Sequence, residues 1–189
     1  PGNPYFSPDL ENLPFDTSKA SALIKKEKLK GHSFTLKTSN DQTAVDNARV
    51  LGAQIAAAGL KINLQSYEWG PFYGDIRAGN FQLATMRWIG ALDPDIYRLA
   101  FHTSEYPPGR NRGRYANSTL DQLVEKGLKI ADEKERIKHY QRVQKIILDD
   151  LAIIPLWYDQ QVAVVHNRVK GYEPWQTSDF FPFLYVTKE

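Results

Sequence analysis

Strand-like and helix-like apolar spacing alternate between residues 33 and 86, and this alternation constrains the fold more than any other feature of the chain. The expected elements, in order, are strand 33–38, helix 42–58, strand 61–65, helix 71–78 and strand 81–86. Connections this short between strands require right-handed crossovers and parallel pairing. The sequence therefore predicts an α/β fold with a mixed, largely parallel sheet flanked by helices.

Further elements are predicted on both sides of this unit. Asp16 or Ser18 can cap a preceding helix, because a short polar side chain accepts hydrogen bonds from the first free amides of a helix. The other expected helices cover residues 16–29, 96–101, 118–131 and 133–151, and apolar runs predict two more strands at 152–157 and 161–165. At 189 residues the chain is long enough for one full core, so one main domain is expected.

Composition excludes several classes of function. The 24 basic and 22 acidic residues give a net charge of only +2, which argues against nucleic acid as a partner. The absence of cysteine removes disulfides, zinc–thiolate sites and thiol nucleophiles, and the four histidines lack the spacing of metal ligands. No glycine-rich phosphate loop, serine elbow or His-Glu-x-x-His helix is present. We therefore expect neither an enzyme nor a bound cofactor.

Polar and aromatic groups follow the strand predicted at 81–86. Their order is Arg87, Trp88, Gly90 and Asp93. Ligands of open α/β sheets bind beyond the carboxyl ends of strands, where this strand delivers these groups. We expect Trp88 to form an apolar wall and Arg87 and Asp93 to make polar contacts. Backbone groups around Gly90 are expected to hydrogen-bond to the same ligand.

Several neighbouring residues have two interpretations. Trp69 either forms a second wall of the site or only staples the start of helix 71–78. Asp95 is expected to cap helix 96–101, whereas Asp93 is left open between a turn and a ligand contact.

The irregular loop at 102–117 adds two further kinds of candidate. His102 is placed to contact a solute. The loop arginines can bind a carboxylate bidentately, although such residues are more often solvated or paired with another part of the protein. They are Arg110, Arg112 and Arg114.

Both ends of the sequence have the composition of connecting segments. Pro4, Pro8 and Pro14 make residues 1–15 a connector, which suggests a piece of a longer protein. Aromatic residues are dense in 171–189, as on a surface that docks against another one.

Short motifs along the chain form an ordered set that covers almost all of it. They lie at 15–20 (Phe-Asp-Thr-Ser-Lys-Ala), 57–62 (Ala-Ala-Gly-Leu-Lys-Ile), 69–73 (Trp-Gly-Pro-Phe-Tyr), 78–81 (Ala-Gly-Asn-Phe), 153–156 (Ile-Ile-Pro-Leu) and 169–171 (Val-Lys-Gly). This ordered set resembles the carboxy-terminal lobe of extracellular solute-binding proteins of family 5, the dipeptide- and oligopeptide-binding receptors of ABC importers.

The resemblance implies one lobe of a two-lobed periplasmic-binding-protein-like fold of type II, which closes over its ligand by hinge motion. Residues 1–15 would then be the connector from a missing amino-terminal lobe, 16–170 the ligand-binding lobe and 171–189 a return segment toward the hinge. The solute, a peptide or another small molecule, would pass to an ABC permease in the membrane. The protein would be periplasmic or attached to the cell surface, for example as a lipoprotein.

One departure from the family pattern bears on the solute. Peptide-binding relatives commonly carry an Asp three residues after the motif tryptophan, where it pairs with the α-amino group of the ligand, and here that position is Ala91. Either Asp93 substitutes for it, or the solute has no free amine at this point. The alternatives are a receptor of the same type for a sugar, an opine or a metal chelate, and a stand-alone sensor or interaction domain.

Overall fold

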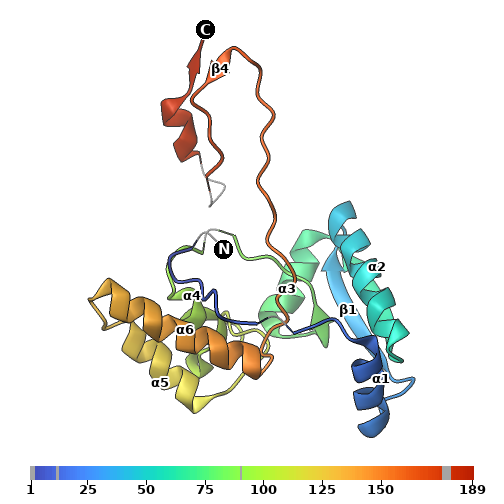
Figure 1. The fold of residues 1–189 in the computed structure, drawn as a ribbon. Helices are drawn as coiled ribbons and strands as arrows, with labels where there is room; N and C mark the ends of the chain where they lie inside the picture. The colour runs from blue at the N-terminus through green and yellow to red at the C-terminus, as the bar shows by residue number, and fades with distance from the viewer. Residues whose placement is uncertain (1–2, 12, 90, 176–179) are drawn as a thin grey trace.

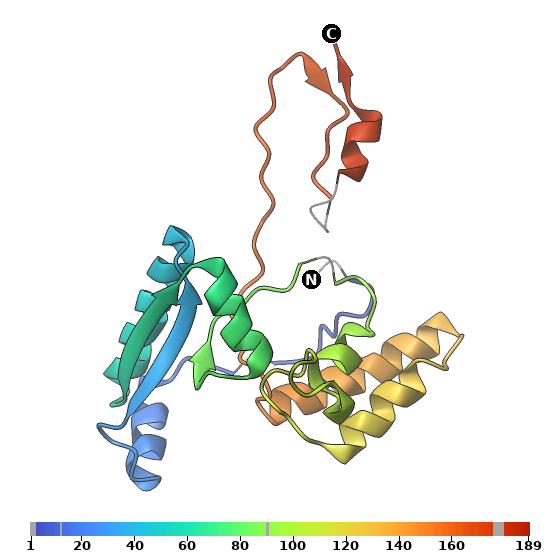
Figure 2. The same ribbon diagram turned by 180° about the vertical axis from the view of Figure 1, so that it is seen from behind.

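The computed structural model describes residues 3–11, 13–89, 91–175 and 180–189. Figures 1 and 2 show a small sheet with its helices beside a separate group of helices, and a long extended segment that leads away from both. The sheet consists of β1 (Ser33–Ser39), β2 (Lys61–Tyr67) and β3 (Leu83–Ala84). The strands are parallel and have the order β2-β1-β3, which confirms the predicted parallel sheet.

The third strand is shorter than predicted. Only Leu83 and Ala84 pair with β1, opposite Leu36 and Lys37, so the strand expected over 81–86 is wrong in its length. The partner strand β1 continues to Ser39, whereas β3 ends at Ala84, and in the described residues no strand pairs with the other side of β3.

Two helices cover opposite faces of the sheet. These are α2 (Gln42–Ala57), which follows β1, and α3 (Trp69–Ala78), which follows β2 (Figure 1). This placement follows from the strand order, because right-handed crossovers in opposite directions put their helices on opposite faces. The helix predicted from Pro71 begins at Trp69, since a proline in the first turn removes only an amide that has no helical partner.

A preceding helix, α1 (Thr17–Lys26), lies beside the end of α2. Its cap is Asp16, one of the two predicted candidates, whose carboxylate accepts a hydrogen bond from the Lys19 amide. The Ser21 hydroxyl donates to the Ala58 carbonyl at 3.0 Å, which ties α1 to the end of α2.

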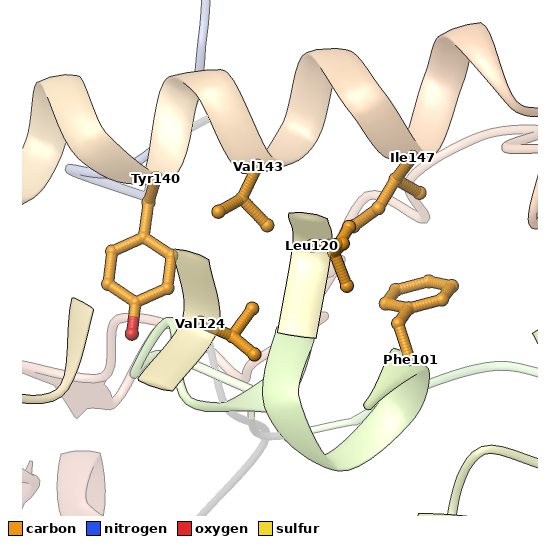
Figure 3. Packing of buried hydrophobic residues seen from close by; sticks show 6 residues of the cluster. All are labelled: Phe101, Leu120, Val124, Tyr140, Val143 and Ile147. Atoms are coloured by element: carbon orange, nitrogen blue, oxygen red, sulfur yellow. The ribbon is translucent and has the colours of Figure 1, made fainter. Parts of the chain in front are cut away.

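A separate hydrophobic core holds the helical group together. It is formed by α4 (Ile96–Phe101), α5 (Ser118–Gly127) and α6 (Glu133–Asp149). The buried residues, drawn in Figure 3, are Phe101, Leu120, Val124, Tyr140, Val143 and Ile147. At Gly127 a Cβ atom would lie 2.7 Å from the Tyr140 ring, so only glycine permits this close approach of α5 and α6. Helix α5 ends before the predicted residue 131, and turns with hydrogen bonds to the third preceding carbonyl follow it.

Part of the predicted connector packs on the helical group. The Gln144 side chain on α6 donates to the Tyr5 carbonyl at 2.6 Å and accepts from the Ser7 amide at 3.2 Å. Ser7 is buried. Residues 3–7 therefore form a strap across α6.

The strands predicted at 152–157 and 161–165 are wrong. Residues 154–166 have an extended course without strand pairing, and Val162 and Val164 are 82% and 98% exposed. Apolar alternation makes a segment suitable for a sheet, but a strand forms only beside a partner, and the described residues supply none here. The segment leads to a hairpin of β4 (Val169–Lys170) and β5 (Thr187–Lys188), with the short helix η2 (Phe181–Tyr185) before β5 (Figure 2).

Candidate ligand-binding site

The strand order places a candidate site at the carboxyl ends of β1 and β3. In the order β2-β1-β3 the chain turns in opposite directions after β1 and after β2, so the topological switch lies between β1 and β3, where open α/β sheets bind ligands. The Thr85 hydroxyl donates to that of buried Thr38 at 2.9 Å, and the Thr85 amide donates to the Lys37 carbonyl at 3.1 Å. These bonds fix the direction in which the chain leaves β3.

Aromatic and sulfur-containing side chains meet an arginine directly beyond this strand end. The Arg112 Cζ lies 5.2 Å from the centre of the Tyr73 ring and 5.3 Å from that of Trp88. Its terminal nitrogens donate to the Tyr73 hydroxyl at 3.3 Å and the Met86 Sδ at 3.1 Å. We call Tyr73, Met86, Trp88 and Arg112 the Arg112 cluster. It joins α3, the end of β3 and the loop before α5.

Trp69 extends this cluster along α3. Its ring stacks on that of Tyr73, four residues further along the helix, with the ring centres 5.5 Å apart and an angle of 13° between the planes. Trp69 is 58% and Trp88 43% exposed. Both tryptophans predicted as walls therefore belong to one exposed aromatic surface, linked through Tyr73 and Arg112.

Arg87, the other predicted polar contact beside Trp88, is already paired. Its guanidinium forms an ion pair with Asp159 in the extended segment, and Asp159 also accepts a hydrogen bond from the Trp157 indole at 3.0 Å. Arg87 thus attaches the extended segment to the strand end.

Asp93 lies in the turn before α4 and is also paired. Its carboxylate accepts from the Asp95 amide at 2.8 Å and lies 3.3 Å from the Arg136 guanidinium on α6. Burial raises the pKa of the Asp93 carboxyl, but the Asp95 amide and the positively charged Arg136 outweigh this effect and hold the pKa below its usual value. In the described structure the Asp93 carboxylate therefore stabilises the turn and forms an ion pair with Arg136.

The role expected for Asp95 is wrong. Asp95 precedes α4 without a side-chain capping bond, and its two oxygens accept from the Nε and Nη2 of Arg98 at 2.8 and 3.1 Å. Arg98 also lies 3.0 Å from Glu105.

His102 contacts Ser104 and Glu125, which do not belong to the Arg112 cluster. Its Nδ1 accepts from the Ser104 amide at 3.0 Å, so its Nε2 carries the proton and donates to Glu125 on α5 at 3.2 Å.

The predicted contact at Gly90 lies outside the described residues. In the described ranges no three His, Cys, Asp or Glu side chains are grouped to hold a metal. No helix of these ranges has the length and apolar character of a membrane span.

Comparison with known proteins assigns the chain to a family. The model of bacterial extracellular solute-binding proteins, family 5 Middle, matches residues 1–107, more than half of the 189 residues. Di/tripeptide-binding protein 4 of Pseudomonas aeruginosa is 28% identical over 176 residues, which are 88% of this chain and 33% of that protein. The chain thus spans about a third of the length of the curated relatives that it matches.

Solved structures agree with this assignment. The ABC transporter substrate binding protein CtaP from Listeria monocytogenes has a TM-score of 0.86 at 26% identity, with 98% of this chain and 39% of that chain covered. The periplasmic binding protein DppA from Helicobacter pylori, solved in complex with the peptide STSA, has a TM-score of 0.84 at 25% identity, with 98% and 37% covered. The expected α/β fold is confirmed, and the chain belongs to the bacterial extracellular solute-binding proteins of family 5.

Proposed function

We propose that this chain is the ligand-binding lobe of a receptor that captures peptides, or solutes of peptide size, for an ABC importer. Membership of solute-binding family 5 and similarity to a di/tripeptide-binding protein support this function. A solute would then pass to a permease in the membrane, and the receptor would be periplasmic or attached to the cell surface. The proposed activity requires no covalent step.

The observation that carries the proposal is the aromatic surface at the topological switch. Trp69, Tyr73 and Trp88 offer ring faces beyond the carboxyl ends of β1 and β3, where a ligand of this type of sheet binds. Ring faces suit peptide bonds and side chains, and few polar groups suffice to orient a solute among them.

A second lobe of the same protein would complete the cleft. We assign residues 1–15 to the connector from that lobe, 16–170 to this lobe and 171–189 to the return toward the hinge. The exposed valines of the extended segment and the exposed aromatic residues of 180–185 support a covering partner. Closure would be favoured by the difference in solute affinity between the closed and open forms.

Substitution of Trp88 tests the location of the site. In the full-length receptor, Trp88→Ala should weaken binding of the cognate peptide by about 1–3 kcal/mol, because apolar contact is lost. Val50→Ala, at an exposed position on α2, is the matched control and should leave affinity unchanged. Calorimetric titration measures both. Unchanged affinity in Trp88→Ala would place the cleft elsewhere.

A further inference from the structure

Among the described residues, some of the arginines discussed above have a carboxylate partner and one has none. The carboxylate of Asp93 lies 3.3 Å from Arg136, and that of Asp159 contacts Arg87. Each of these carboxylates is therefore matched by its own guanidinium. The guanidinium groups of Arg87 and Arg136 are neutralised in this way.

Arg112 differs from both. Within the described ranges its hydrogen bonds go to a phenol and a thioether, and none of the ion pairs includes it. Its Nε–H is buried and has no hydrogen-bond partner there. A guanidinium that is partly removed from water without a counter-charge raises the free energy of the unbound protein, and a bound anion would recover that cost.

The surroundings of Arg112 favour an anion further. Arg110 and Arg114 lie two positions away on either side in the same loop and add positive charge. Contacts with Tyr73, Met86 and Trp88 hold the guanidinium at the aromatic surface, so little side-chain entropy remains to be lost on binding. The planar fork of an arginine matches the two oxygens of a carboxylate.

We infer that Arg112 binds a carboxylate group of the solute. This inference rests on the proposed function and makes it more specific, since it assigns a negative charge to the part of the solute that lies against the Arg112 cluster. Other solutes with a carboxylate, such as small organic acids, would satisfy the same residue.

Matched acids and amides test the charge requirement in the unmodified full-length receptor. One pool contains peptides of two to five residues as free acids and as carboxy-terminal amides, and a second contains small organic acids and their amides. Calorimetry or native mass spectrometry ranks them. In the pool that binds, the acids should bind about tenfold or more tightly than their amides. Equal binding of acids and amides would overturn the inference.

Variants of Arg112 then test whether this residue causes the preference for acids over amides. Arg112→Gln should bring the acid-to-amide ratio to within about threefold of one, because the charge is lost. Arg112→Lys should restore part of the ratio, since it retains a cation without the planar fork. Arg142→Gln, at an exposed position on α6, is the control and should keep the full ratio. A full ratio in Arg112→Gln, or no restoration in Arg112→Lys, would contradict the inference.

The two pools separate this inference from the proposed function. Peptides that bind without a preference for the acid would leave the peptide receptor in place and overturn the role of Arg112. Organic acids that bind through Arg112, without any binding of peptides, would support Arg112 and contradict the peptide proposal. Failure of both pools to bind would contradict both.

Discussion

Asp95 shows at the scale of one residue how backbone conformation decides what a carboxylate does. A capping residue has an extended backbone that directs its side chain back to the first amides of the helix. Asp95 has a φ of −60° and a ψ of −15°, which is helical, so its carboxylate reaches forward to Arg98 instead. Asp93, two residues earlier, accepts from the Asp95 amide.

Asp95→Asn and Asp95→Ala distinguish the two roles. Both should lower the free energy of unfolding by about 1 kcal/mol, because either change removes the ion pair with partly buried Arg98. Asparagine is as good a cap as aspartate, so a capping role would leave Asp95→Asn unchanged. Urea unfolding gives the values, and in an Arg98→Met background both losses should shrink.

Tyr97 should make the free energy of unfolding depend on pH in the alkaline range. Burial, followed by the effect of Tyr158, raises the pKa of its phenol to about 12, whereas the unfolded chain ionises near the ordinary value of 10.0. The folded state therefore holds a proton that the unfolded state loses, so stability is complete below pH 10 and falls as pH rises toward 12. Tyr97→Phe should reduce this fall, measured by unfolding at pH 7 and at several values above pH 9. An unaltered slope would show that Tyr97 does not cause it.

At the scale of elements, the sequence predicts those helices and strands whose formation depends on a single segment of the chain. Helices α2 and α6 have a long apolar stripe and lie close to the predicted bounds. The runs at 152–157 and 161–165 have the apolar content of strands, but pairing depends on a second segment, which sequence pattern does not show. The exposed positions of Trp69 and Trp88 could be predicted from their places at element ends, whereas their role in binding stays a prediction. Tyr73 was missed and Arg112 was only one of three loop arginines, because their contact joins residues 39 positions apart.

Alanine substitutions at two valines compare the packed helix α6 with the unpaired extended segment. Val143 on α6 is fully buried, so Val143→Ala should lower the free energy of unfolding of the 189-residue chain through a lost contact and a cavity, by about 1–3 kcal/mol. Val164→Ala should change it by less than about 0.5 kcal/mol, because Val164 is 98% exposed. Denaturant unfolding measures both. A large loss in Val164→Ala would show that the segment packs in solution.

At the scale of the whole molecule, the proposed two-lobed arrangement predicts weak binding by this chain alone. Roughly half of the contacts that enclose a solute in such a cleft would be absent. Calorimetry with the 189-residue chain should therefore show no submicromolar binding of the peptides that the full-length receptor binds. Tight binding by this chain would favour a self-contained module.

The extended segment has a consequence for production and storage of the chain. Residues 162–165, Val-Ala-Val-Val, are uncharged and β-branched except for the alanine, and no strand of the described residues lies alongside them. Backbone groups and valines arranged in this way form a template on which the same segment of another molecule can add as a strand. Aggregation would then start at this segment, while the sheet and the helical core of each molecule remain folded. If the proposed second lobe covers this segment, it would also protect the receptor against self-association.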